Sequence, residues 1–174
     1  MAQILALDQN GNRLIPLVSC GGSPKEAHAL LAKQKASDLF PQAFAPEAAL
    51  AGLCVYFSWF DQGHAIAQEI ASAEGSFWHG ILHRQEPDAG NAAYWFRQTG
   101  GHPVFPDLAS AAGAIAERYV QAKFSVAARW DPFAFIDFCE RARGLPGTPA
   151  ERAALEIQRE EWQLLFDYCE RPRP

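Results

Sequence analysis

The sequence predicts an all-α domain of about seven helices in an antiparallel array. Helix-start signals recur along the chain, and the apolar residues between them repeat at helical spacing. The chain has 174 residues, of which 49% are hydrophobic and 20% charged, a composition that supports one domain with its own core. We expect residues 1–22 to form an N-terminal arm or short hairpin and residues 23–171 to form a single helical domain.

The N-terminal segment is the only part of the sequence that favours strands. Residues 3–18 contain two short apolar runs on either side of Asn10-Gly11. Asn-Gly between such runs is typical of a tight β-hairpin. We therefore predict a short N-terminal β-hairpin or an extended arm, followed by a break at Gly21-Gly22.

The rest of the chain contains residues that typically begin and end helices. Ser23 with Glu26 and Thr148 with Glu151 have the spacing of a capping box, in which each side chain satisfies a free backbone amide of the first turn. We expect helices over residues 24–35, 46–71, 74–86, 89–99, 108–128, 132–143 and from 149 to near the C-terminus. The first half of the 46–71 segment is apolar on every side, which predicts a central buried helix.

Charge and composition argue against several classes of partner. The net charge is −5 and the Lys and Arg residues are scattered, so we expect no nucleic-acid binding. No apolar stretch is long enough to span a membrane, and the N-terminus lacks the pattern of a signal peptide. The four widely spaced cysteines suggest free thiols in a reducing compartment, so we expect a cytoplasmic protein.

Familiar catalytic signatures are missing from the sequence. It has no GxGxxG, no GxxxxGK[ST], no GxSxG and no HExxH motif. The common enzymes that carry these motifs are thereby set aside, but an enzyme of another kind is not.

Residues 80–99 resemble one tetratricopeptide repeat. The small, acidic and aromatic positions of the repeat are matched by Gly80, Asp88, Ala92 and Phe96. The segment departs from the pattern at Pro87 and Thr99, and no second copy follows at the repeat period. The resemblance implies a close helical hairpin, in which small residues let two helices approach and Phe96 fills the groove between them.

A longer stretch, residues 75–105, is similar to a family of uncharacterised bacterial proteins. The matching sequence is GSFWHGILHRQEPDAGNAAYWFRQTGGHPVF. This similarity supports the helical fold and brings no activity that could be transferred.

A group of histidines is the strongest candidate for a metal site. His79, His83 and Glu86 fall within one narrow arc of the 74–86 helix. Histidines at i and i+4 with a carboxylate at i+7 have side chains that converge on one point and suit a divalent, zinc-like metal. Histidines in this pattern also often form hydrogen bonds inside a helical core, and that alternative stays open.

The preceding helix adds further polar residues. Asp61, His64 and Gln68 continue the stripe that carries apolar residues earlier in the 46–71 segment. Because a short turn joins this helix to the next, the two should be antiparallel neighbours, and His64 should face His79 or His83. We expect a metal, if one binds, to use these three histidines, with Glu86 or Asp61 as the carboxylate.

The following helix suggests a binding site for an anion. Tyr94 and Arg97 share one side of the 89–99 helix, and Arg84 lies just before it. Arginines beside aromatic rings hold carboxylate or phosphate groups, although they also lock helices together by pairing with carboxylates such as Glu86. The candidate ligand-binding residues are His79, His83, Arg84, Glu86, Asn91, Tyr94, Trp95 and Arg97.

Three functions follow from these patterns. The leading expectation is a non-catalytic binding or scaffold protein that holds a peptide or a small anionic ligand in a groove between helices. The second is a metal-binding helical enzyme of the hydrolase kind that uses His64, His79 and His83. The third is a structural homo-oligomer that associates through its aromatic face.

Overall fold

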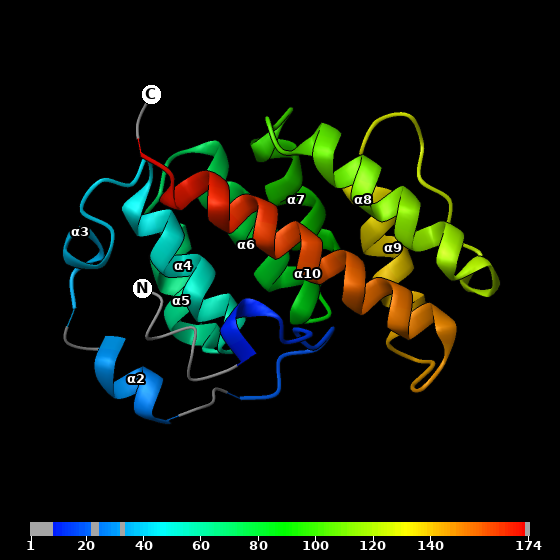
Figure 1. Cartoon of the computed structure of the whole chain (residues 1–174), viewed down its shortest axis with the longest axis horizontal. Helices are drawn as coiled ribbons and strands as arrows, with labels where there is room; N and C mark the ends of the chain where they lie inside the picture. The colour runs from blue at the N-terminus through cyan, green and yellow to red at the C-terminus, as the bar shows by residue number, and fades with distance from the viewer. Residues whose placement is uncertain (1–8, 22–24, 32–33, 173–174) are drawn as a thin grey trace.

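The computed structural model describes residues 9–21, 25–31 and 34–172 of the chain, and these residues form helices and connecting loops without a regular strand (Figure 1). The all-α prediction is confirmed. The elements are η1 (Gln9–Gly11), α2 (Lys25–Leu31), α3 (Ala36–Leu39), α4 (Pro46–Tyr56), α5 (Phe60–Gln68), α6 (Ala73–Gln85), α7 (Ala89–Thr99), α8 (Phe105–Arg118), η2 (Val120–Ala122), α9 (Pro132–Ala142) and α10 (Pro149–Glu170).

Three of the predicted helices begin at a short polar side chain that caps the first turn. Asp88 accepts a hydrogen bond from the backbone N–H of Asn91 at 3.0 Å, and Asp131 caps α9 in the same way. Thr148 accepts from the N–H of Glu151 at 3.4 Å. These short polar side chains satisfy amides that a helix leaves free in its first turn, which explains why their positions could be predicted.

The single helix predicted over residues 46–71 is wrong, because the chain breaks between α4 and α5. Ser58 has a φ of 58°, in the left-handed region, and it ends α4. The rings of Phe57 and Trp59 stack at the break with centroids 5.0 Å apart, and both residues are buried. Packing of two aromatic rings therefore stabilises this turn, and no glycine or proline marks its position in the sequence.

The predicted β-hairpin around Asn10-Gly11 is not confirmed. Its first strand lies partly outside the described residues, and residues 9–11 form a 3-10 turn. The following segment pairs with helix side chains instead of a strand. The carbonyl of Ile15 accepts from the amide of Gln158 at 2.8 Å, and that of Pro16 accepts from Gln85 at 2.9 Å.

The ends of two other predicted helices need correction. The helix predicted over 108–128 begins earlier and ends sooner, as α8, with Pro106 in its first turn and a left-handed Lys123 after η2. The helix predicted over 24–35 ends at Leu31 as α2, and the short α3 follows it. Ser23, the predicted cap of that first helix, lies outside the described residues.

Helix α6 lies at the centre of the domain. It contacts α4, α5 and α7, and every residue from Glu74 to Gln85 is buried. Helix α10 is the longest and crosses the front of the molecule in Figure 1, where it packs on α4, α8 and α9. No helix among the described residues is long and apolar enough to cross a membrane.

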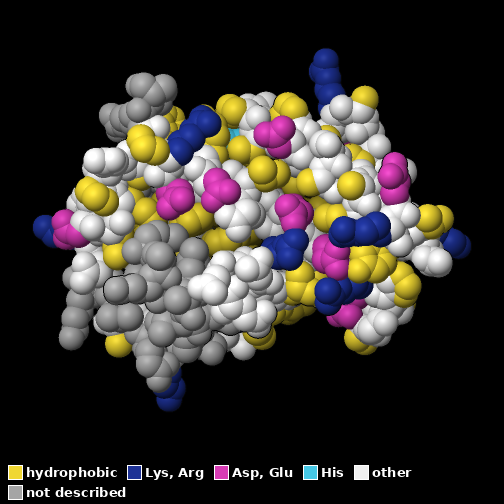
Figure 2. Space-filling model, in the orientation of Figure 1, with side chains coloured by type: hydrophobic (Ala, Val, Ile, Leu, Met, Phe, Trp, Pro, Cys, Tyr) yellow, Lys and Arg dark blue, Asp and Glu magenta, His cyan; other side chains and the backbone are white. Residues whose placement is uncertain are grey.

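Acidic and basic side chains are interspersed on the face that α10 crosses (Figure 2). Two arginines there share one acceptor, because Arg118 and Arg152 both donate to the carboxylate of Glu156, at 2.6 and 2.7 Å. The positive charge of these two arginines is thus partly compensated by one carboxylate.

The close approach of α6 and α7 depends on Gly80. A Cβ atom added to Gly80 would lie 2.9 Å from the ring of Phe96, which is shorter than a normal contact. The hairpin expected from residues 80–99 is therefore formed, with Phe96 against Gly80, while its kinship with tetratricopeptide repeats stays a prediction.

We expect Gly80→Ala to lower the free energy of unfolding by about 1–3 kcal/mol, because the new methyl group overpacks the contact with Phe96. Gly113→Ala in α8 is the matched control, since a Cβ there meets no atom within 4 Å. It should raise stability by about 0.5–1 kcal/mol, the usual gain when alanine replaces glycine inside a helix. Urea unfolding measures both, and equal effects would contradict the packing described.

A buried ion pair joins α6 to α10. Arg84 and Glu161 are both 0% exposed, and the guanidinium donates to both carboxylate oxygens, in one case at 3.1 Å. Arg84 also donates to the side-chain oxygen of Gln158 at 3.3 Å. Because Gln158 in turn binds the Ile15 carbonyl, one polar network holds α6, α10 and the N-terminal segment together.

Arg84→Met should cost about 3–5 kcal/mol of unfolding free energy, because it leaves the Glu161 carboxylate buried and unpaired. The double variant Arg84→Met with Glu161→Leu should recover much of this loss, since no buried charge remains. Arg118, whose side chain is exposed, provides the reference, because Glu156 keeps its bonds to Arg152 and Tyr119 when Arg118 is removed. Arg118→Ala should therefore cost less than about 1 kcal/mol. If Arg84→Met lowered the free energy of unfolding no more than Arg118→Ala does, the buried network would not stabilise the fold as described.

Candidate metal centre

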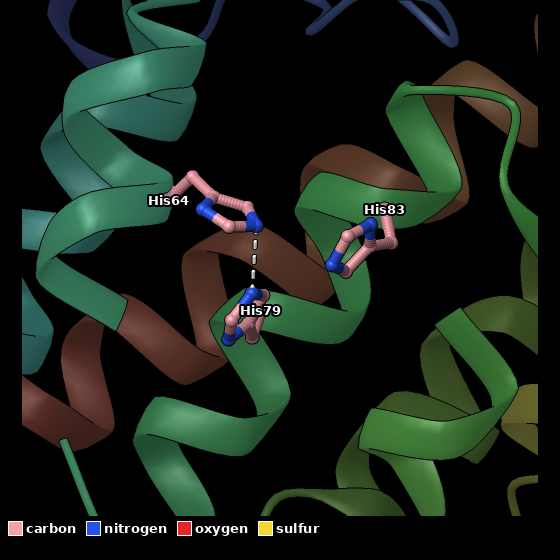
Figure 3. A group of neighbouring side chains, drawn as sticks. All are labelled: His64, His79 and His83. Carbon is pink, nitrogen blue, oxygen red and sulfur yellow. Dashed lines mark hydrogen bonds between the residues drawn. The ribbon is translucent and has the colours of Figure 1, made fainter. Parts of the chain in front are cut away.

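Three histidines from two neighbouring helices meet beside the core (Figure 3). His64 comes from α5, whereas His79 and His83 stand one turn apart on α6. One ring nitrogen of each lies within 4.8 Å of the others. His79 and His83 are buried and His64 is half-buried, so the group is reached from the α5 side.

The prediction that His64 faces the α6 histidines is confirmed, although the polar stripe expected to continue from α4 into α5 is not formed. The break at Ser58 interrupts the stripe that was to run from the apolar residues of α4 into α5. Asp61 and Gln68 are exposed, and the buried residues of α5 are Gly63 and Ala67. His64 meets His79 because α5 folds back against α6 after the break.

His64 and His79 approach each other through their Nε2 atoms, which are 2.9 Å apart. One of the two must donate and the other accept, since a neutral imidazole has one of each. Two imidazole nitrogens on one tetrahedral zinc lie about 3.3 Å apart, because each zinc–nitrogen bond is about 2.0–2.1 Å. The observed separation is thus close to that of a shared metal ion, and His83 needs only a modest side-chain movement to join it.

Glu86 sets the tautomer of His83. Its carboxylate oxygen lies 3.1 Å from Nδ1 of His83. A carboxylate only accepts hydrogen bonds, so Nδ1 carries the proton and Nε2 of His83 presents its lone pair. This is the usual outer-shell arrangement of a metal-binding histidine, in which a carboxylate orients the ring.

The electrostatics keep the rings of His64 and His79 neutral. Burial, and after it the neighbouring His64 and His83, lower the pKa of His79 to about 4. The pKa of His64 is also lowered, first by burial and then by His83. Neutral imidazole is the form that binds metals. At neutral pH the site therefore needs to lose no proton from these two rings before it binds a cation.

Trp95 covers one side of the group. Its indole stacks on the ring of His79, with centroids 3.9 Å apart and the planes within 15° of parallel. Trp95 is half-buried, while its neighbour Tyr94 is 49% exposed and packs edge-on against the indole. The predicted aromatic residues of α7 are thus divided, because Trp95 closes the site and Tyr94 faces solvent.

The open side of the group leads into a pocket of about 450 Å³. His64 and Glu86 lie on its wall, together with the carboxylates of Asp61 and Glu69. No lysine or arginine lines it among the described residues. The entrance is therefore acidic, and such a surface raises the local concentration of cations.

Several predicted ligand-binding residues lie elsewhere. Arg84 is enclosed in its pair with Glu161 and pairs with neither Glu86 nor Asp88. Asn91 is exposed at the start of α7, where its amide donates to Asp88 at 2.7 Å. Arg97 is exposed near the C-terminal end of α7. The structure therefore brings together the histidines, Glu86 and Trp95, and it separates them from the two arginines.

A pair of His102 with Glu74 lies apart from the three histidines. His102 follows a glycine pair in a loop, yet it is 4% exposed, and its Nε2 atom lies 3.7 Å from a carboxylate oxygen of Glu74. The pKa of Glu74 is lowered to about 2, above all by the neighbouring His102 side chain. This pair ties the start of α6 to the loop before α8. The Gly100-Gly101 break before His102 gave no sign that the histidine would turn inward.

Comparison with models of known protein families, with curated proteins and with solved structures finds no match for this chain. The geometry of its side chains is therefore the ground for any functional proposal.

The pKa of His79 leads to a prediction for the metal-free protein. An unfolded chain takes up a proton on this residue below about pH 6.5, whereas the folded protein does so only near pH 4. The free energy of unfolding should therefore fall as the pH drops below 6.5, by about 2 kcal/mol from this residue at pH 5. Above pH 6.5 the titration of this residue should no longer change the free energy of unfolding with pH.

His79→Gln keeps an amide in place of the ring and should flatten this part of the pH dependence. Denaturant unfolding at pH 7 and pH 5, with a chelator present, measures the difference. Glu74 contributes to acid sensitivity only below about pH 4.5, so it does not disturb the comparison. Equal losses in wild type and variant would show that His79 is protonated normally in the folded protein.

Proposed function

We propose that this protein binds one divalent transition metal ion, of the zinc type, through His64, His79 and His83. The observation that carries the proposal is the convergence of three ring nitrogens within 4.8 Å. Two further features support it. Glu86 holds His83 in the tautomer that a metal needs, and the Nε2 atoms of His64 and His79 already lie 2.9 Å apart.

The donor set favours zinc among the common metals. Imidazole nitrogen suits zinc, copper, nickel and iron, whereas magnesium and calcium prefer oxygen ligands. Three histidines leave one position of a tetrahedron for water or substrate, as in catalytic rather than structural zinc sites. The acidic pocket beside His64 lies where that fourth ligand would enter.

A metal held in this way supports hydrolytic chemistry. A zinc ion with three protein ligands lowers the pKa of a bound water to about 7 and so supplies hydroxide at neutral pH. Asp61 and Glu69 line the entrance, and as carboxylates they disfavour strongly anionic substrates. We therefore expect a neutral or cationic substrate if the centre is catalytic.

The other functions expected from the sequence stay predictions. A scaffold role with a bound peptide or small anion does not require the metal, and neither does self-association through the aromatic face. Both are compatible with a protein that also carries a metal centre.

The proposal predicts one tightly bound zinc ion per chain. Protein purified without chelators or nickel columns is dialysed, reconstituted with zinc, dialysed again and measured by elemental analysis. His79→Ala should lose the ion, whereas His28→Ala should keep it, because His28 is exposed, packs edge-on against Trp59 and is not one of the three converging histidines. Less than stoichiometric zinc in the wild type, or zinc retained equally by both variants, would refute the proposal.

Glu86→Gln tests the outer shell separately. The amide can present its own N–H toward His83 and no longer fixes the tautomer, so zinc affinity should fall by about 10–100-fold. Cobalt titration offers a local readout, because Trp95 stacks on His79 and its fluorescence should be quenched. Trp95→Phe should remove that response while the stoichiometry stays the same. An unchanged affinity in Glu86→Gln would mean that the carboxylate does not orient the ligand.

A further inference from the structure

A second pocket, of about 950 Å³, lies between the end of α7 and the starts of α8 and α9. Its size falls within the range of pockets that hold small molecules, 300–1,000 Å³. The wall is mostly apolar and includes Phe96, Phe105, Trp130 and Phe133. Phe96 and Trp130 are buried, so the floor of the pocket belongs to the core of the domain.

Two arginines supply the polar part of this wall. Arg97 comes from the last turn of α7, and its guanidinium lies over the ring of Phe133, 5.8 Å from the centroid. Arg129 comes from the loop before α9. Both side chains are exposed, and neither forms an ion pair with a described residue. Five other arginines among the described residues form ion pairs, whereas the charges of Arg97 and Arg129 are available to a ligand.

The remaining charge on the wall does not cancel them. Asp131 lines the pocket, but one of its carboxylate oxygens accepts hydrogen bonds from the backbone N–H groups of Phe133 and Ala134. Two guanidinium groups against one carboxylate leave a net positive wall, in a protein whose overall charge is −5. The pocket thus combines an apolar surface with a net positive charge, opposite in sign to the net charge of the whole protein.

We infer that this pocket binds a small organic acid, with an aromatic or aliphatic body against Phe105, Trp130 and Phe133 and a carboxylate on Arg97 or Arg129. Arginine is suited to this task because its planar fork can hold a carboxylate through two parallel hydrogen bonds. The apolar body accounts for the greater part of the wall, so a bare inorganic anion would leave most of the pocket unfilled.

The site is separate from the metal centre. Residues two apart on an α-helix point about 200° apart, so Arg97 and Trp95 face different sides of α7. No residue lines both this pocket and the one beside His64. The inference therefore does not rest on metal binding, and each can fail without the other.

The test uses naphthalene-1-acetate and its neutral counterpart, naphthalene-1-acetamide, which share one apolar body. Isothermal titration calorimetry is run on the full chain with a chelator present, so that the carboxylate cannot bind a metal. The acetate should bind at least about tenfold more tightly than the acetamide, because only the former gains the charge-assisted bonds to arginine. Plain acetate should bind weakly.

Arg97→Gln with Arg129→Gln should reduce the affinity for naphthalene-1-acetate to that of the acetamide. The matched control is Arg141→Gln with Arg171→Gln, which removes two exposed arginines that also lie over aromatic rings but outside the pocket. It should leave binding unchanged. His64→Ala should also bind the acid normally, which separates this site from the metal centre.

A third variant tests the location without touching charge. Gly101 lines the pocket, and a Cβ added there meets no atom within 4 Å, so Gly101→Trp should fold and obstruct the cavity. It should weaken both naphthalene compounds by about tenfold or more, the scale on which lost apolar contact of this size is felt. Equal binding of acid and amide, no effect of the double arginine variant, or unchanged binding in Gly101→Trp would each overturn the inference.

Discussion

The fold depends on the buried ion pair between Arg84 and Glu161, because α6 is buried along its length although it carries an arginine and several other polar groups. Burial of an unpaired guanidinium is prohibitively costly, so α6 can occupy the centre only if α10 brings Glu161 to meet Arg84. Gln158, one turn earlier on α10, extends the same contact to the Ile15 carbonyl. The ion pair therefore fixes the register of the longest helix against the central one and gives the N-terminal segment its place.

Much of the helical content was predictable, because helix starts depend on local chemistry. Asp88, Asp131 and Thr148 act on amides two or three residues away, and nothing distant is needed to identify them. The break at Ser58 was not predictable, since it is stabilised by the stacking of Phe57 on Trp59 inside the core. The prediction for the N-terminal segment failed for the same reason, because the hydrogen-bond partners of this segment lie up to 143 residues away.

The candidate site shows the same division. The i, i+4 spacing placed His79 and His83 together, and the short connection between helices brought His64 to them. The pairing of Arg84 could not be predicted without knowing where α10 lies. One signal was present in the sequence: Gln158 and Glu161 sit on the otherwise apolar face of α10, and polar residues in such a place call for a buried partner.

The polar groups of α6 differ in the kind of partner that the fold gives them. Arg84 has two acceptor residues on α10, although its Nε atom has no partner among the described residues, and Gln85 donates to the Pro16 carbonyl. The hydrogen-bond contact of His79 is with another imidazole, and its Nδ1 has no partner among the described residues. His83 donates to the Glu86 carboxylate and presents its other nitrogen as an acceptor. Because the nitrogens of His64 and His79 meet each other rather than a carboxylate or a carbonyl, beside an acidic entrance, they are well placed to serve as metal ligands.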